Sequence, residues 1–298
     1  MIIQQQPINE FLLWNNCNNQ CKFCHQKANK TKYPGKFPDD KGKLKSIQLV
    51  KSFIEDGKVA NGSHFLFMGG ELFDTELSTE TESAFLNLAA MVANRMIANL
   101  TGLLYLNTNL IYSDTSLLYK FLRTFTDKGL DNRLRLTTSY DIDYRYKNLQ
   151  DKQTAEHNMQ KISKDFPNVA RVANCILTDK ACEFLYSNLD FLSIFKQKYG
   201  FELNLIPYIT LHQYMAPQRK DLLSLFVKLN TVYPGFIERY TDNLAVNQER
   251  ILWEFNGNEL IYASSKNADC EHNENFRRVY ANDDRCFICD CNQLFNNM

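Results

Sequence analysis

The chain has 298 residues, of which 44% are hydrophobic and 23% are charged. This composition is typical of a globular protein and excludes a disordered or fibrous chain. The 34 basic and 34 acidic residues give a formal net charge of zero, so no overall charge draws the chain to nucleic acid or to an anionic membrane.

Strand-like and helix-like segments alternate over most of the chain. The predicted strands, which are short and rich in apolar or β-branched residues, are Phe11–Asn15, His64–Met68, Leu103–Asn107, Arg133–Thr138, Arg171–Leu177 and Glu202–Tyr208. The predicted helices are Ile47–Glu55, Thr81–Ala98, Ser116–Thr126, Asp151–Lys164, Lys180–Lys198 and Lys220–Leu229. Strands that are each followed by a helix predict an α/β fold with a parallel sheet. Because a closed barrel needs two further units, we expect an open, partial (β/α)6 TIM-like barrel.

Polar residues follow the predicted strands, where parallel α/β folds gather their binding and catalytic groups. The segments in question are Cys17–Cys24, Gly69-Gly70-Glu71, Thr108-Asn109, Ser139-Tyr140-Asp141 and Thr178, after the first to the fifth strand. Because the carboxyl ends of parallel strands meet at one edge of the sheet, we expect these groups to converge on one mouth.

The last part of the chain has a different pattern. Arg250–Phe255 and Glu259–Ala263, separated by Asn256-Gly257-Asn258, predict a β-hairpin. A cysteine-rich tail follows. We therefore divide the chain into a partial barrel, residues 1–231, and a small C-terminal extension, residues 232–298, which is expected to pack on the barrel.

The chain contains nine cysteines, most of them in two clusters. No apolar stretch approaches the roughly 18 residues that span a bilayer, and the first residues lack the features of a secretory signal. We expect a cytoplasmic protein that does not act on membranes, in which clustered cysteines bind metal rather than form disulfides. Cys175 and Cys182 stand apart from the clusters and are predicted to be core thiols.

The front cluster consists of Cys17, Cys21 and Cys24, in a C-x3-C-x2-C pattern. Three thiolates this close together can bind three irons of a 4Fe–4S cluster and leave the fourth iron open to a chelating small molecule. The alternative is a zinc site that is completed by His25 or by a distant cysteine.

This pattern, with Phe23 before the last cysteine, resembles the signature of the radical S-adenosylmethionine (radical SAM) superfamily. Gly69-Gly70-Glu71 looks like the GGE motif of that family, and the strand–helix units are similar to its partial barrel. The resemblance extends over residues 8–230. It implies an enzyme that cleaves S-adenosylmethionine reductively to a 5′-deoxyadenosyl radical, which abstracts hydrogen from a substrate. It also implies an electron donor such as flavodoxin or ferredoxin.

The resemblance assigns roles to individual residues. The three front cysteines would hold the cluster, while Gly69, Gly70 and Glu71 would meet the methionyl amino group. The backbone near Phe23 is expected to lie beside the adenine. Ser139 and Asp141 are expected to bind the cofactor or the substrate, and Asn109 and Asn174 are expected to bind the cofactor.

The tail holds Cys270, Cys286, Cys289 and Cys291 within 22 residues, which is a complete ligand set for one further metal site. His272 can replace one of these ligands. The position of the tail resembles the SPASM and twitch extensions of radical SAM enzymes, which carry auxiliary 4Fe–4S clusters, although it has fewer cysteines than a full SPASM domain. We expect an auxiliary cluster, with structural zinc as the alternative.

The substrate is the least constrained part of the interpretation. Enzymes with auxiliary clusters of this kind commonly modify peptides or proteins, so a peptide or protein substrate is the first hypothesis. A nucleotide or nucleic acid is the second, because eight lysines between Cys21 and Ser46 suggest a basic loop, although a solvated surface loop is the plainer interpretation. A non-catalytic iron–sulfur or zinc protein is the third. Arg145 is a further candidate to pair with a carboxylate of the substrate or cofactor, although an ion pair with Asp143 is the plainer interpretation.

Overall fold

The computed structural model describes residues 6–14, 16–19, 21, 39–73, 77–207, 217–237, 250–255 and 259–266. Its strands are β1 (Ile8–Leu12), β2 (His64–Met68), β3 (Leu104–Asn107), β4 (Leu134–Tyr140), β5 (Ala170–Leu177), β6 (Glu202–Pro207), β7 (Arg250–Phe255) and β8 (Leu260–Lys266). Its helices are α2 (Asp40–Glu55), α3 (Thr79–Ile97), α4 (Ser116–Thr126), α5 (Leu149–Asp165), α6 (Asp179–Ser187), α7 (Phe191–Tyr199) and α8 (Arg219–Val232).

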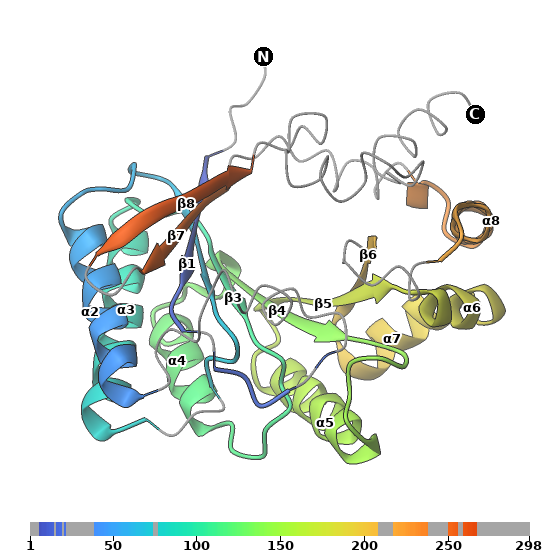
Figure 1. The fold of residues 1–298 in the computed structure, drawn as a ribbon, viewed down its shortest axis with the longest axis horizontal. Helices are drawn as coiled ribbons and strands as arrows, with labels where there is room; N and C mark the ends of the chain where they lie inside the picture. Colours follow the sequence, from blue (N-terminus) through green and yellow to red (C-terminus); the bar gives the residue numbers. More distant parts are fainter. Residues whose placement is uncertain are drawn as a thin grey trace.

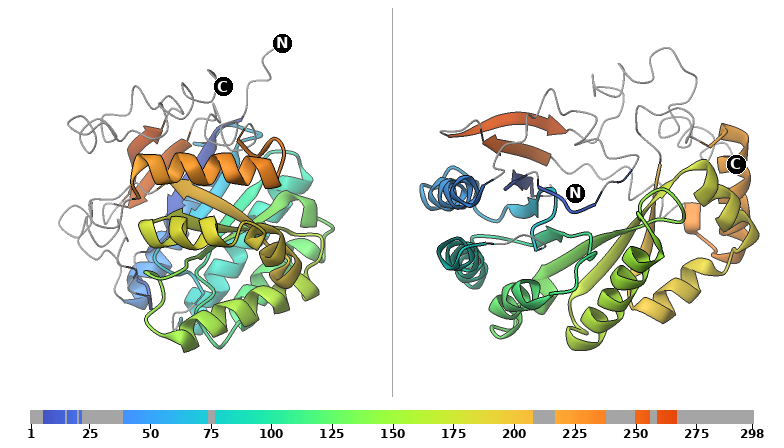
Figure 2. Two further views of the ribbon diagram at one scale, coloured as in Figure 1. Left: turned by 90° about the vertical axis from the view of Figure 1, so that its right-hand side faces the viewer. Right: turned by 60° about the horizontal axis from the view of Figure 1, so that its bottom comes forward.

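The strands form one curved sheet, and the helices lie along its outer side (Figures 1 and 2). The strand order is β6-β5-β4-β3-β2-β1-β7-β8. Neighbouring strands from β6 to β7 are parallel, and β8 runs antiparallel to β7. The α/β class and the parallel sheet of alternating strand–helix units are therefore confirmed, in an arrangement compatible with a partial barrel.

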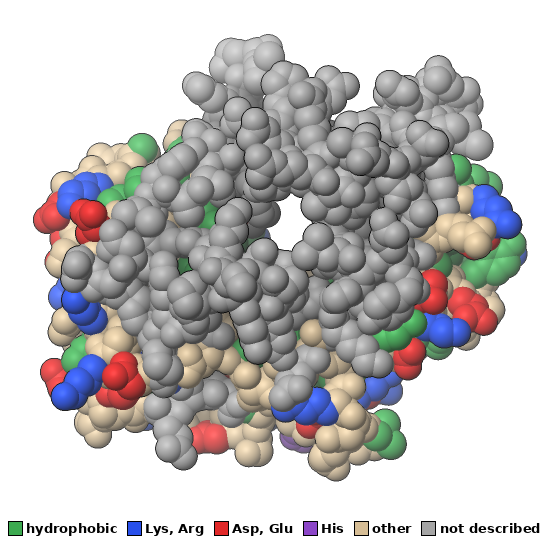
Figure 3. Space-filling view, viewed as in Figure 1, with side chains coloured by type: hydrophobic (Ala, Val, Ile, Leu, Met, Phe, Trp, Pro, Cys, Tyr) green, Lys and Arg blue, Asp and Glu red, His purple; other side chains and the backbone are tan. Residues whose placement is uncertain are grey.

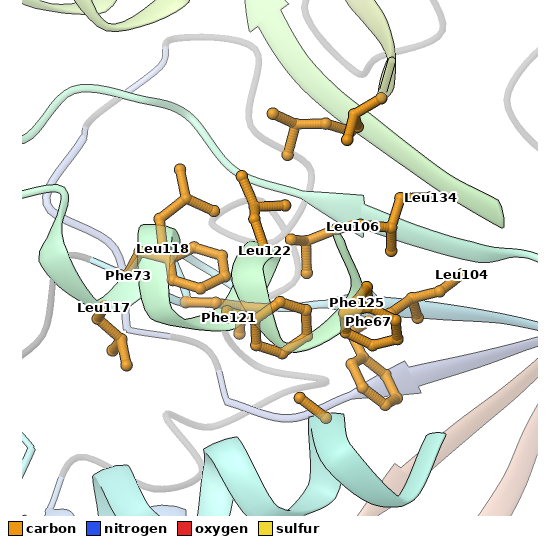
Figure 4. Close-up of a cluster of buried hydrophobic side chains, with 14 of the residues drawn as sticks. Phe67, Phe73, Leu104, Leu106, Leu117, Leu118, Phe121, Leu122, Phe125 and Leu134 are labelled. Carbon is orange, nitrogen blue, oxygen red and sulfur yellow. The ribbon is translucent and has the colours of Figure 1, made fainter. Parts of the chain in front are cut away.

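The core fills the space between the sheet and the outer helices. Alternate residues of each strand point to the helices, so that Leu134 and Leu136 of β4 are buried while Thr137 and Ser139 on the opposite face are half-buried. Helix α4 turns one apolar stripe toward these strands; its buried residues are Leu117, Leu118, Phe121, Leu122 and Phe125 (Figure 4). Each such side chain contributes roughly 1.5–3 kcal/mol by leaving water. This packing fixes the strands, whose carboxyl ends then carry the site.

The first strand begins three residues earlier than the sequence pattern predicts. It spans Ile8–Leu12 instead of Phe11–Asn15, and its polar residues Asn9 and Glu10 are only 2% and 3% exposed. They are buried because β1 has a parallel neighbour on each side, β2 and β7. Strands are predicted from their apolar side chains, so the polar residues Asn9 and Glu10 did not fall within the predicted strand.

Helix α2 also begins earlier than predicted, and this corrects the interpretation of the basic segment. The carboxylate of Asp39 accepts a hydrogen bond from the backbone N–H of Gly42 (2.9 Å) and caps the helix. Lys41, Lys43 and Lys45 therefore belong to a helix and not to a loop. Lys43 is only 4% exposed, and its Nζ lies 5.9 Å from the centre of the Trp14 ring. The other lysines of the segment lie outside the described residues.

The predicted helix Lys180–Lys198 is two helices, α6 and α7. Thr178 caps α6 by accepting the N–H of Ala181 (3.1 Å), and Asn188 follows the last residue of that helix. The side-chain amide of Asn188 donates to the carbonyl of Phe184 (2.8 Å), an alternative to continued helix that asparagine commonly provides. Asp190 then precedes the first residue of α7.

The predicted hairpin is confirmed as β7 and β8, with its turn outside the described residues. Its position could not be read from the sequence, because β7 pairs in parallel with β1 and so continues the main sheet (Figure 1). The Trp253 side chain fixes this junction. Its Nε1 donates to Asn9 Oδ1 (3.0 Å), and its ring centre lies 4.6 Å from that of Phe53 in α2.

Acidic and basic side chains are mixed on the described part of the surface in Figure 3, as expected for a chain without net charge. Among the described residues, no helix has the length and apolar character needed to cross a membrane.

Candidate metal and cofactor site

The loop that follows β1 runs directly beside the segment that follows β2. The N–H of Leu13 donates to Met68 O (2.9 Å), and the N–H of Gly70 donates to Trp14 O (2.8 Å). One step further, the N–H of Glu71 donates to Asn16 O (2.6 Å). Backbone hydrogen bonds therefore join the chain that leads into Cys17 to Gly69-Gly70-Glu71, as the convergence of strand ends predicts.

This close approach explains why residue 69 is glycine. A Cβ added at Gly69 would lie 2.4 Å from the carbonyl oxygen of Trp14, which is shorter than any ordinary contact. Trp14 is itself fixed, because its side chain is fully buried and its Nε1 donates to Glu71 O (2.9 Å). The hydroxyl of Ser46 in α2 adds a hydrogen bond to Leu13 O (2.7 Å). The sequence therefore builds a rigid support immediately before the first cysteine.

The carboxylate of Glu71 joins the ends of β2 and β3. It is 1% exposed, and its Oε1 accepts the N–H of Phe73 (3.0 Å) and the hydroxyl of Thr108 (2.8 Å). Its Oε2 accepts the N–H of Asn109 (2.5 Å). These donors compensate the burial of a charged group, which is otherwise costly. The carboxylate therefore holds two loops of the mouth together.

The described cysteines of the front cluster lie close together and receive N–H donors from the chain. The backbone N–H of Asn19 donates to Cys17 Sγ (3.4 Å), and the side-chain amide of Asn19 donates to Cys21 Sγ (3.3 Å). The side-chain amide of Asn109 also donates to Cys17 Sγ (3.7 Å). Cys17 is exposed and Cys21 is partly exposed, and neither forms a disulfide. N–H donors favour the thiolate form, which is the form that binds metal.

These features fit the metal site that the sequence predicts. Two sulfurs lie within hydrogen-bond distance of the same residue, Asn19, and Cys17 is exposed. The third cysteine, Cys24, lies outside the described residues, as do Phe23 and His25. Within the described ranges alone, no group of three His, Cys, Asp or Glu side chains is placed to hold a metal ion.

The side chain of Asn109, which is predicted to bind the cofactor, lies between two loops of the mouth. Its Oδ1 accepts the N–H of Ile111 (2.7 Å), and its Nδ2 donates to Asn18 Oδ1 (2.7 Å) as well as to Cys17 Sγ. The side chain of Asn18 in turn donates to Ile111 O (2.5 Å), and Lys147 donates to Asn18 O. Asn109 therefore ties the cysteine loop to the loop after β3.

Ser139 and Asn174, both predicted to bind the cofactor, are brought side by side. They are register partners on β4 and β5, and Asn174 is in turn the register partner of Asn204 on β6. All three are half-buried, and Asn204 Nδ2 donates to Asn174 Oδ1 (3.0 Å). With strands about 4.8 Å apart, the three positions form a row roughly 10 Å long. The sequence analysis missed Asn204, because a single asparagine within a strand carries no signal until its register is known.

Asp141 is fully buried and organises the loop after β4. Its Oδ1 accepts the backbone N–H groups of Asp143 (2.8 Å) and Tyr144 (2.7 Å), and its Oδ2 has no hydrogen-bond partner among the described residues. Burial raises the pKa of the Asp141 carboxyl, while these N–H donors and the nearby Arg145 lower it. These contacts hold the Asp141 side chain against the loop that follows β4.

The remaining candidates divide into buried residues and residues outside the described ranges. Cys175 and Cys182 are 0% and 4% exposed in an apolar cluster, which confirms that they are core thiols, and burial raises the pKa of Cys182 to about 12. Thr178 is also buried, as the cap of α6. The tail ligands Cys270, Cys286, Cys289 and Cys291, together with His272, lie outside the described residues.

Comparison with known proteins adds no assignment. No protein-family model matches the chain, and no curated protein has a significant match to it.

Proposed function

We propose that the protein is a radical SAM enzyme with a 4Fe–4S cluster on Cys17, Cys21 and Cys24. The observation that carries this proposal is the backbone pairing of the loop before Cys17 with Gly69-Gly70-Glu71, at the carboxyl ends of parallel strands. A structural zinc site needs no such neighbour, whereas an open metal position needs a binding surface beside it for a small molecule. The partial barrel provides that surface.

The chain's own residues would hold and orient the cofactor. When bound, the cluster and S-adenosylmethionine supply a one-electron cleavage that yields the 5′-deoxyadenosyl radical. The backbone around Gly69 and Gly70 would lie against the methionyl group, in the position that the close packing of Gly69 on the Trp14 carbonyl fixes. Ser139 and Asn174 provide neutral hydrogen-bonding groups across the mouth for the ribose. An electron donor such as flavodoxin or ferredoxin would supply the electron in the cytoplasm.

A peptide or protein is the proposed substrate. Next to Asn174, which is proposed for the ribose, Asn204 on β6 adds a further uncharged hydrogen-bonding group, which suits an amide better than a phosphate. The charged side chains Arg135 and Arg171 lie near the start of their strands and donate there to backbone carbonyls. Lys41, Lys43 and Lys45 belong to helix α2. This weakens the hypothesis that a basic loop covers a nucleotide substrate.

Anaerobic reconstitution with iron and sulfide tests this proposal. We expect the protein to become brown and, with dithionite and S-adenosylmethionine, to form 5′-deoxyadenosine, measured by liquid chromatography and mass spectrometry. A protein that binds only zinc and forms no 5′-deoxyadenosine would contradict the proposal and favour a non-catalytic metal protein.

An auxiliary 4Fe–4S cluster on Cys270, Cys286, Cys289 and Cys291 forms part of the proposal. Cys286→Ala is expected to lower the iron content by one cluster while some cleavage of S-adenosylmethionine continues without substrate, because the front cysteines stay intact. Iron analysis of the two reconstituted proteins checks this. Two results would exclude an auxiliary iron–sulfur cluster. One is iron in Cys286→Ala equal to that of the wild type, and the other is zinc in place of iron at the tail cysteines of the wild-type protein.

A further inference from the structure

Two asparagine side chains, Asn19 and Asn109, direct N–H groups at the cysteine sulfurs of the site. They are 2% and 4% exposed, so water does not compete freely for these bonds. Asn19 donates to Cys21 Sγ through its side chain (3.3 Å) and to Cys17 Sγ through its backbone (3.4 Å). Asn109 donates to Cys17 Sγ through its side chain (3.7 Å). We refer to Asn19 and Asn109 together as the amide shell.

The orientation of the Asn109 amide is fixed by its other contacts. Its Oδ1 accepts the N–H of Ile111 (2.7 Å), so the carbonyl end faces its own loop and the NH₂ end must face the cysteine. One N–H of that group reaches Asn18 Oδ1 (2.7 Å), which leaves the other for Cys17 Sγ. The backbone of Asn109 is held in turn by the carboxylate of Glu71 (2.5 Å). The backbone N–H and the whole side-chain amide of Asn109 are therefore held by the protein itself.

We propose that the amide shell positions Cys17 and Cys21 as ligands and raises the reduction potential of the cluster that they bind. This inference rests on the proposed function. An N–H donor stabilises a sulfur more strongly as the sulfur becomes more negative, and reduction adds negative charge that the ligand sulfurs share. The donors therefore favour the reduced form. Asn109 acts as a positioning residue in this proposal and not as the cofactor contact that the sequence suggests.

The test compares Asn109→Asp, Asn109→Ala and Asn158→Ala after anaerobic reconstitution. Asn109→Asp keeps an oxygen for the N–H of Ile111, removes the donors and adds a negative charge, while Asn109→Ala removes the donors without adding charge. Asn158 is the matched control, because it is 4% exposed and its amide donates to Leu110 O (3.0 Å) and Tyr112 O (2.7 Å) of the same loop. Both of these hydrogen bonds go to carbonyls and neither goes to a sulfur.

Two quantities are measured. The first is the iron content per chain, and the second is the midpoint potential of the cluster, which a potentiometric titration monitored by electron paramagnetic resonance gives. We expect both Asn109 variants to have a more negative potential, with the larger shift in Asn109→Asp, and Asn158→Ala to keep the wild-type potential. Loss of iron from the Asn109 variants alone also supports the positioning role. Unchanged potentials in the Asn109 variants, or a shift or iron loss in Asn158→Ala equal to that in Asn109→Ala, would overturn the inference. Absence of a cluster from the wild type would instead contradict the proposed function.

Discussion

Cys17→Ala is expected to prevent assembly of the front cluster and to abolish 5′-deoxyadenosine formation, while the fold stays intact. The thiolate of Cys17 is one of three proposed ligands, and alanine offers no group that binds iron. The side chain is exposed, so its removal leaves no cavity in the core. The support before it is held by Trp14, which is fully buried, and by the pairing of Trp14 O with Gly70. The free energy of unfolding should therefore change by less than about 1 kcal/mol.

The matched control for this variant is Cys182→Ala. Cys182 is 4% exposed in α6, and burial raises the pKa of its thiol to about 12, so it is a protonated core thiol. Its loss should leave iron, sulfide and 5′-deoxyadenosine at wild-type levels while lowering stability slightly. Iron and sulfide assays, product analysis and urea denaturation of the apoproteins separate the two variants. Full iron content and product formation in Cys17→Ala would refute the ligand assignment.

The fold was largely predictable because its strands and helices differ in periodicity. His64–Met68 and Ser116–Thr126 match their predictions residue for residue, since each is an apolar segment bounded by polar residues. The predictions failed where tertiary partners outweigh local pattern. Asn9 and Glu10 are strand residues because β1 pairs with both β2 and β7, of which β7 lies far along the chain. The same long-range pairing explains why the hairpin was predictable and its place in the sheet was not.

The site was predictable at the level of loops and not at the level of side-chain contacts. The convergence of Cys17 with Gly69 and Glu71 follows from parallel strands, whose ends meet at one edge. The direction of a polar side chain depends on partners that local sequence does not reveal. Asn109 was assigned to the cofactor, yet its amide is directed at Asn18 and Cys17. A signal for Asn19 was present, since an amide residue between two metal-binding cysteines is close enough to donate to sulfur, as Asn19 does to Cys21 Sγ.

Removal of the Glu71 carboxylate is expected to have the largest effect on stability. Its oxygens accept hydrogen bonds from Phe73 (3.0 Å), Thr108 (2.8 Å) and Asn109 (2.5 Å), and the residue is 1% exposed. Glu71→Ala leaves two buried N–H groups and a hydroxyl without this acceptor, and it opens a cavity. Unsatisfied buried groups cost about 1–3 kcal/mol each, so we expect a loss of roughly 3–5 kcal/mol in the free energy of unfolding.

Glu71→Gln distinguishes the role of charge and acceptor geometry from that of volume. A glutamine of nearly the same size must turn an NH₂ group toward one of these donors, so we expect it to lose about 2–4 kcal/mol. Glu55→Gln serves as the control, because its side chain is 51% exposed at the end of α2 and surface substitutions change stability by about 0.5 kcal/mol or less. Urea denaturation of the apoproteins measures all three variants. Because Glu71 holds the Asn109 backbone, loss of its carboxylate should also reduce the iron that the protein retains. If Glu71→Gln is as stable as Glu55→Gln and keeps its full iron content, the carboxylate does not join the two loops.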